Sequence, residues 1–273
     1  MSSSISLSAG VRQNLLSLQD TASLLSQTQN RLATGKKVNS ALDNANSFFT
    51  AQSLTNRANS LSNLLDGITN GINTIQAANN GISAITKLVQ SAQSLVTQAQ
   101  QTTDTTIRAT LATQFGATLT QIDQLAGDSG FNGTNLLGGN DLTVTLNETG
   151  TSTATVASVN DTTAGALSIG AATSSWAGST DIAAAAADLT AALTTLRSQS
   201  AALGSSLSTI QIRADFTKAT INTLQTGSDA LTVADSNEEG ANLLALQTRQ
   251  SLSTTALSLS AQSDRNVLKL FGG

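Results

Sequence analysis

The chain contains no cysteine, proline, histidine or tyrosine among its 273 residues, and each absence excludes a class of structure or chemistry. Without cysteine and histidine there is no thiol nucleophile, imidazole base or soft-metal ligand, so disulfide frameworks, zinc sites and Ser–His–Asp triads are excluded. Proline costs about 3 kcal/mol in a helix interior, so its absence favours long helices. No other catalytic constellation is present. We therefore predict a structural protein that is not an enzyme and needs no cofactor or metal.

Long apolar runs and basic clusters are also missing. The longest unbroken apolar run, residues 182–187, is much shorter than the roughly 20 residues needed to span a bilayer. No basic region precedes the first apolar residues, so we expect no cleaved secretory signal peptide. No basic cluster is larger than the Lys36–Lys37 pair, which argues against a nucleic-acid partner. We expect neither a membrane nor a nucleic acid among the partners.

The charged residues are unevenly distributed along the chain. Of the 13 basic residues, none lies between Arg108 and Arg197, whereas seven of the 17 acidic residues do. The middle therefore carries a charge of −7, and the two flanks together carry +13 − 10 = +3. This asymmetry indicates that the middle and the flanks face different surroundings. The alternative is a chance gap in a chain with only 11% charged residues.

Apolar residues recur at alternating steps of three and four, which is the spacing of a coiled-coil seam. The first such stripe begins at Val11 and reaches Leu32, and we expect its helix to end at Thr34 with Gly35 as the C-terminal cap. A second stripe runs over residues 58–99 and predicts a helix about 63 Å long. Further helical stripes cover residues 107–125 and 182–231, and a weaker one contains Leu252, Leu259 and Leu270.

Three glycines interrupt the second stripe, at positions 67, 71 and 81. Each costs about 1 kcal/mol relative to alanine in a helix, so either neighbouring segments approach closely there or the helix is locally weak. The Asn-Gly pairs at 70–71 and 80–81 are also typical of hairpin turns. The continued apolar period on both sides favours the helix.

The middle of the chain has a different pattern. Residues 127–139 are rich in glycine and asparagine and predict an irregular segment. Apolar and polar residues then alternate with period two over residues 141–147, 154–159 and 167–169, which predicts short strands joined as hairpins.

These patterns predict a mainly α protein. We expect a long antiparallel helical rod or coiled coil, with a small β-hairpin region at one tip and the terminal helices paired at the other. The expected divisions are terminal helices at 1–34 and 240–273, connecting segments at 35–57 and 232–239, the helical rod at 58–137 and 181–231, and a short β-rich region at 138–180.

The terminal helices have two possible arrangements. They pair with each other as a two-helix hairpin, or their apolar stripes are buried only against other copies of the chain, with folding on association. The residues predicted to pack between subunits are Val11, Leu15, Leu18, Leu25, Leu32, Leu252, Leu259 and Leu270. At the junction with the rod, we expect the Lys36–Lys37 pair to lie near the Glu238–Glu239 pair, within or between subunits.

Several segments resemble those of bacterial flagellins, in the order found in that family. Residues 31–46, Arg-Leu-Ala-Thr-Gly-Lys-Lys-Val-Asn-Ser-Ala-Leu-Asp-Asn-Ala-Asn, match its first conserved segment, and Leu65-Asp-Gly-Ile68 resembles a turn further along. Gly130-Phe-Asn-Gly-Thr-Asn-Leu-Leu137 resembles the element that precedes the variable middle. Residues 233–239 and 252–268 resemble the C-terminal signature. The resemblance covers about the first 137 and the last 90 residues.

The resemblance implies a structural subunit of the flagellar filament, secreted unfolded by the flagellar type III apparatus and located outside the cell. Expected partners are other flagellin subunits, a flagellin chaperone, and the hook-associated and cap proteins. The terminal helices would form the inner filament core and the short middle the outer surface, without large outer domains. A hook–filament junction protein of the same superfamily is the alternative. Gln93-Ser94-Leu95 replaces a charged Arg-Glu-Leu run, which predicts weakened recognition by the animal flagellin receptor.

Overall fold

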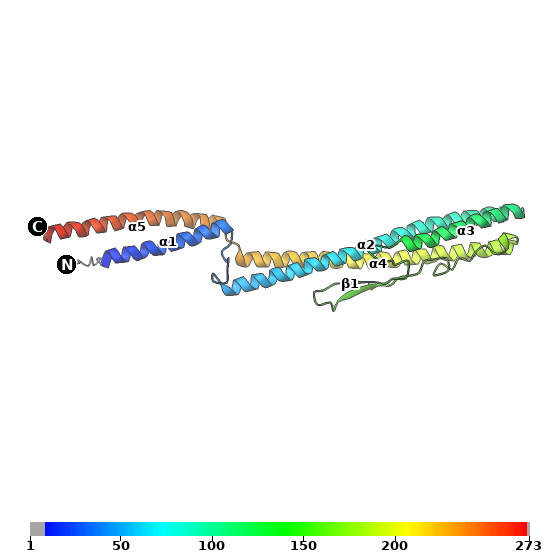
Figure 1. Ribbon diagram of the computed structural model, residues 1–273, viewed down its shortest axis with the longest axis horizontal. Coiled ribbons are helices and arrows are strands. Elements are labelled where there is room, and N and C mark those ends of the chain that lie inside the picture. Colours follow the sequence, from blue (N-terminus) through cyan, green and yellow to red (C-terminus); the bar gives the residue numbers. More distant parts are fainter. Residues whose placement is uncertain (1–8, 272–273) are drawn as a thin grey trace. The chain divides into compact units, whose positions relative to one another are not determined.

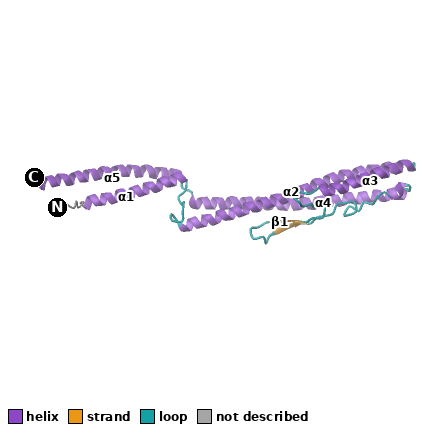
Figure 2. Ribbon diagram, in the orientation of Figure 1, coloured by secondary structure: helices purple, strands orange, loops and turns teal. Residues whose placement is uncertain are grey.

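The computed structural model describes residues 9–271, without the side chains of residues 264 and 267–271. This part of the chain is mainly α, as predicted, with a single two-stranded sheet (Figures 1 and 2). It divides into two compact units: α1 and α5 belong to the first, and residues 57–222 form the second. The elements are α1 (Ala9–Thr34), α2 (Ala45–Gln101), α3 (Thr105–Asp128), β1 (Leu142–Thr145), β2 (Thr153–Val156), the short 3-10 helix η1 (Thr173–Trp176), α4 (Ser179–Thr232) and α5 (Ser236–Phe271).

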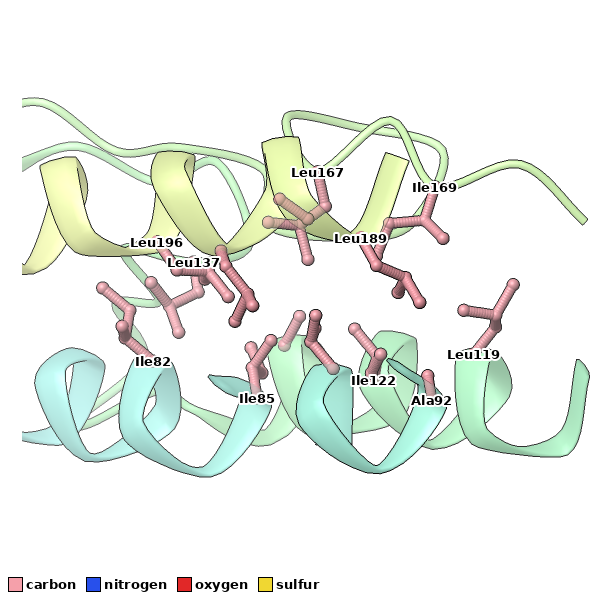
Figure 3. Close-up of a cluster of buried hydrophobic side chains, with 14 of the residues drawn as sticks. Ile82, Ile85, Ala92, Leu119, Ile122, Leu137, Leu167, Ile169, Leu189 and Leu196 are labelled. Atoms are coloured by element: carbon pink, nitrogen blue, oxygen red, sulfur yellow. The ribbon is translucent and has the colours of Figure 1, made fainter. Parts of the chain in front are cut away.

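The second unit is built around one apolar core shared by α2, α3 and α4. Helix α3 runs antiparallel to α2, because Arg108 near its start donates from Nε to the carbonyl oxygens of Ala99 (3.2 Å) and Thr102 (2.8 Å). Asp104 caps α3 by accepting from the backbone N–H groups of Thr106 and Ile107. Figure 3 shows core side chains from all three helices meeting, among them Ile82, Ile85, Ala92, Ile122, Leu189 and Leu196.

The glycines of α2 lie within one continuous helix, so the helical interpretation of the Asn-Gly pairs is confirmed. A methyl group on Gly71 would overlap the side chain of Val144, and one on Gly81 would overlap Ser129 and Leu137. Around Gly67 there is nothing within 4 Å. The glycines therefore permit close approach at two positions, and only Gly67 leaves the helix weakened without a packing reason.

The sheet is a hairpin of β1 and β2, paired antiparallel with Leu142 opposite Val156. Two of the three predicted strands are confirmed, but the strand expected at residues 167–169 is wrong. Ser168 has a φ of +48°, which no strand accommodates. Leu167 and Ile169 are nevertheless buried in the core, so the alternation reflects burial around a turn.

The position of the hairpin also differs from expectation. We predicted it at the tip of the rod, but Val144 packs over Gly71, far from the end of α2 at Gln101. Helix α3 has 24 residues and carries the chain about 36 Å back along the rod before the hairpin begins. The hairpin therefore lies beside the helices of this unit.

The connecting segments are shorter than the expected 35–57 and 232–239, because two N-cap residues start helices early. Asn44 Oδ1 accepts from the backbone N–H of Ser47 (3.0 Å), and α2 begins at Ala45. Asp235 Oδ1 accepts from the N–H of Asn237 (2.8 Å), and α5 begins at Ser236. Asparagine and aspartate are preferred N-caps, so this signal was present in the sequence. Gly35, with a φ of +68°, follows the end of α1 as predicted.

Candidate functional site: the terminal helix pair

Helices α1 and α5 pack side by side and antiparallel in the first unit (Figure 1). Towards one end Asn14 Nδ2 donates to Ser260 Oγ (3.4 Å), and at the other Arg31 contacts Glu239. The two-helix hairpin is therefore formed within a single chain. The residues buried between α1 and α5 determine which side chains of the pair stay available for contacts with other molecules.

The surface between α1 and α5 contains polar and apolar side chains in nearly equal number. Thr21 is only 2% exposed, and its hydroxyl donates to the carbonyl oxygen of Ser17 (2.7 Å). Residues that are buried or half-buried recur at steps of three and four on both helices, as in a coiled-coil seam. On α1 they are Val11, Asn14, Leu18, Thr21, Leu25 and Thr28, and on α5 Glu239, Leu243, Leu246, Gln250, Ser253, Leu257 and Ser260.

Several leucines of the pair lie outside this seam and are exposed. On α5, Leu244, Leu252 and Leu259 are 67–69% exposed. Their spacings of eight and seven residues place them on one face of the helix, turned away from the seam; we call these three residues the α5 leucine stripe. Four leucines of α1 are also exposed: Leu15, Leu16, Leu24 and Leu32.

The residues predicted to pack between subunits fall into three groups. Val11 is buried, and Leu18 and Leu25 are half-buried in the seam. Leu15, Leu32, Leu252 and Leu259 are exposed in the single chain, and the side chain of Leu270 lies outside the described part. The helices therefore pair within the chain, as in the first sequence-based alternative, while several leucines stay uncovered. Their packing between subunits remains a prediction.

At the junction, Arg31 Nη1 donates to Glu239 Oε1 at 3.0 Å, and the Glu239 side chain is 9% exposed. Arg31 Nε and Glu239 Oε2 are buried without a hydrogen-bond partner among the described residues. Lys37 Nζ donates to the carbonyl oxygen of Ala230 (3.0 Å). Within the chain, Glu239 therefore pairs with Arg31 and not with the two lysines. Contact of Lys36 and Lys37 with Glu238 and Glu239 of a neighbouring subunit stays a prediction.

The loop before α2 presents apolar side chains that the sequence analysis missed. Leu42 is 97% exposed, and Phe49, in the second turn of α2, is 62% exposed. Asp43 holds this loop, because its Oδ2 accepts from the backbone N–H groups of Ser40 and Asn39, both at 2.9 Å. These hydrogen bonds keep the pKa of Asp43 below its ordinary value. An isolated Leu in a polar loop gives no periodic signal, so only the structure reveals its exposure.

Two family comparisons match the two ends of the chain. The sequence model described as the bacterial flagellin N-terminal helical region matches residues 5–141, which is half of the chain. The model of the bacterial flagellin C-terminal helical region matches residues 186–271. The chain belongs to the bacterial flagellins. Flagellins are structural proteins of the bacterial flagellar filament, which agrees with the prediction of a non-enzymatic chain.

Individual flagellins match over different lengths. Flagellin FljK of Caulobacter vibrioides is 30% identical over 277 residues, covering 98% of both chains. Flagellin FljM of the same organism is 29% identical over 269 residues, again 98% of both. Flagellin A of Rhizobium meliloti is 42% identical over 81 residues, 30% of this chain, and the match spans only 20% of its own length.

No described helix is long and apolar enough to cross a membrane. Nor does the described part of this flagellin hold a group of three or more acidic, cysteine or histidine residues that could bind a metal ion.

Proposed function

We propose that this flagellin polymerises with copies of itself into the extracellular filament used for swimming, with α1 and α5 in its inner core. The observation that carries the proposal is the α5 leucine stripe. Three leucines on one face of one helix are more than two-thirds exposed, while the opposite face is covered by α1. A soluble protein rarely exposes a row of leucines on one helix face unless that face meets a partner.

The energetics favour a repeating partner. Full burial of one leucine side chain stabilises by about 1.5–3 kcal/mol, and the α5 leucine stripe offers three such side chains in every subunit. The exposed leucines of α1 belong to the same helix pair. Since each subunit presents the same surfaces, a helical polymer buries these leucines in every subunit through one repeated kind of contact.

Export of the unfolded chain by the flagellar type III apparatus is part of the proposal. The chain has no cysteine, so no disulfide has to be broken before passage. Seven of the thirteen residues in the seam between α1 and α5 are polar, which limits the apolar burial between the two helices and supports their easy separation. A chaperone that covers the α5 leucine stripe before export would prevent premature association. The hook-associated and cap proteins complete the proposed partners.

Seeded assembly of the full chain tests the proposal. Purified subunits are added to short filament fragments, and filament length is measured by negative-stain microscopy. The double variant L252S/L259S should lose elongation while its far-ultraviolet circular dichroism stays unchanged, because both side chains are exposed in the single chain. The matched control is Ile107→Ser, which replaces a 50% exposed apolar side chain in the second unit. It should elongate normally.

Two outcomes would overturn the proposal. Elongation by L252S/L259S at the rate of the unchanged chain would show that the α5 leucine stripe is not a subunit contact. Unchanged protein that binds to seeds but never elongates them would identify a hook–filament junction protein instead.

A further inference from the structure

The second unit contains a cavity of about 230 Å³ between the segment that follows β2 and the helices α2 and α4. Its walls are mostly apolar, formed by residues such as Ile82, Leu137, Val156 and Leu203. Four polar residues also line it: Thr155, Asp161, Gln199 and Ser206. Asp161 is completely buried, although burial of an ionised carboxylate in apolar surroundings is costly unless it is fully hydrogen-bonded.

Asp161 and Gln199 are joined by one hydrogen bond and each has one buried atom left over. Gln199 Nε2 donates to Asp161 Oδ1 at 2.8 Å. Asp161 Oδ2 and Gln199 Oε1 have no partner among the described residues. Both remaining atoms are acceptors when the carboxylate is ionised, so they cannot bond to each other. A proton on Asp161 changes Oδ2 into a donor, and the side-chain oxygen of the same Gln199 is a buried acceptor without a donor.

No charged group compensates the carboxylate of Asp161. Burial raises its pKa from 3.8 to about 6, and the hydrogen bond from Gln199 opposes this only in part. On α3, Asp123 accepts from the N–H of Thr163, and on α4, Asp188 accepts from the N–H of Gly170. The basic residues on the adjoining helices, Lys87 of α2 and Arg197 of α4, are exposed.

From this arrangement we infer that Asp161 and Gln199 form a proton-dependent latch between the segment after β2 and α4. With a proton on Asp161 Oδ2, that O–H donates to Gln199 Oε1, and two hydrogen bonds fasten the segment to the helix. When the proton leaves to solvent, only the bond from Gln199 Nε2 to Asp161 Oδ1 remains. The segment is therefore held more firmly in mild acid than at alkaline pH.

The direction of the pH effect follows from linkage. A carboxyl group with a raised pKa binds its proton more tightly in the folded chain than in the unfolded one. Above pH 6 the ionised form disfavours folding, and this penalty shrinks as the pH falls towards 3.8. The pKa difference corresponds to roughly a hundredfold change in the folding equilibrium of this unit.

Asp141 acts on the same segment in the opposite sense. Its Oδ1 accepts from the hydroxyl and the backbone N–H of Ser158, both at 2.7 Å, and these bonds lower its pKa. The bonds of Asp141 are stronger to the ionised form and persist at neutral pH, weakening only as the pH falls through its lowered pKa. As the pH falls, Asp161 therefore gains its second hydrogen bond while Asp141 is still ionised and still bonded to Ser158.

The test is thermal unfolding of the full chain followed by the fluorescence of Trp176. This residue is the only tryptophan, is fully buried and packs on Phe115 with ring centroids 4.9 Å apart, so it reports on the second unit. Asp161→Asn mimics the protonated acid, because its amide donates to Gln199 Oε1 at every pH. It should raise the folding equilibrium at pH 8, and this gain should be about tenfold smaller at pH 5, where the native acid is already protonated.

Two further variants separate the latch from a general charge effect. Asp66→Asn removes one negative charge from an exposed position of the same unit and should give no comparable gain. Gln199→Met removes one hydrogen bond from the ionised acid but two from the protonated acid, so it should lower stability more at pH 5 than at pH 8. The latch is refuted if Asp161→Asn lowers stability at pH 8 or gives equal gains at pH 8 and pH 5, or if Gln199→Met costs as much stability at pH 8 as at pH 5.

A titration of the unchanged protein by nuclear magnetic resonance does not depend on how the variants fold. The carboxyl carbon of Asp161 should titrate near pH 6, and the side-chain amide protons of Gln199 should shift with the same midpoint. An amide of Gln199 that shows no shift across that range would contradict a bond to the titrating proton.

Discussion

Arg31 Nη1 donates to Glu239 Oε1 across 3.0 Å, and this ion pair joins the last turn of α1 to the first turn of α5. The pair is largely removed from water on the glutamate side, where 9% of the side chain is exposed. Around it the backbone is tied as well, since the N–H groups of Lys37 and Ala234 donate to the carbonyl oxygens of Thr232 and Gly35. The two terminal helices therefore leave the junction in a fixed relationship.

Glu239→Gln should loosen the terminal helix pair. The change leaves the positive charge of Arg31 without its partner, and because Arg31 is about one-third exposed, we expect a loss of about 1–3 kcal/mol. Hydrogen exchange of the amides of α1 and α5 measures it. Glu238→Gln, an exposed neighbour in the same helical turn, is the matched control and should change little. Equal effects of the two variants would contradict the pairing.

The succession of elements could be predicted from the sequence, because it depends on local patterns. The apolar period of α2 outweighed its Asn-Gly pairs, and Gly35 ended α1 as expected. The false strand at residues 167–169 arose because alternating burial, with Leu167 and Ile169 inward, resembles a strand even when Ser168 has a positive φ. An alternation of apolar and polar residues indicates which side chains are buried, but it does not by itself determine the backbone conformation.

The candidate site could be predicted only in part. The unpartnered leucines were recognised, and Val11, Leu18 and Leu25 of the predicted stripe do lie in the seam of the terminal helices. Thr21 and Thr28 share that buried face, whereas Leu252 and Leu259 face outward. Apolar stripes normally mark the buried face, so the apolar pattern alone does not separate the seam leucines from the exposed ones. The burial of Asp161 depends on the tertiary arrangement, so no local sequence pattern predicts it.

The absence of basic residues from the middle has a structural counterpart. Several carboxylates there accept hydrogen bonds from neutral groups: Asp123 from Thr163, Asp141 from Ser158, Asp161 from Gln199 and Asp188 from Gly170. Three of these bonds join the segment around the hairpin to α3 and α4, and the bond between Asp141 and Ser158 joins the two ends of the hairpin itself. A basic residue from outside the middle also contributes, since Arg57 of α2 pairs with Glu148 in the turn of the hairpin at 3.1 Å.

Cysteine labelling should distinguish inner from outer positions in assembled filaments. The chain has no native cysteine, so the labelling of each introduced thiol is measured without a background from other cysteines. Thr151→Cys and Ser158→Cys should react with a maleimide both before and after assembly, as expected of an outer surface. Leu259→Cys should react in the free subunit, where Leu259 is 69% exposed, and become protected in the filament.

Leu18→Cys, at a half-buried seam position, should react slowly in the free subunit and not at all after assembly. Protection of Thr151→Cys and Leu259→Cys to the same extent in filaments would contradict the proposed inner position of the terminal helices.

Charge reversal should reveal whether Lys36 and Glu238 meet between subunits. Neither side chain has an ion-pair partner among the described residues, and Glu239 is already paired with Arg31. Lys36→Glu should slow seeded elongation, and Glu238→Lys in the same chain should partly restore it. Exposed pairs contribute only about 0–1 kcal/mol, so the effect should fade as salt is raised. A double variant no better than the sum of the single ones would exclude the contact.

Gly67 and Gly81 allow a matched test of helix packing within α2. Gly67→Ala adds a methyl group where nothing lies within 4 Å, so it should stabilise the second unit by about 1 kcal/mol through helix propensity alone. Gly81→Ala places the same methyl group against Ser129 and against Leu137 Cδ1 at 2.8 Å. Ser129 cannot move freely, because its hydroxyl donates to the carbonyl oxygen of Leu125 at 2.6 Å.

We therefore expect Gly81→Ala to destabilise the unit by about 1–3 kcal/mol, the usual cost of overpacking. In thermal unfolding followed by Trp176 fluorescence, each kcal/mol should shift the midpoint by about 2–4 °C, upward for Gly67→Ala and downward for Gly81→Ala. The opposite signs are the decisive feature, because both variants make the same chemical change in one helix. Equal upward shifts would mean that the segment containing Ser129 and Leu137 does not pack on α2 in solution.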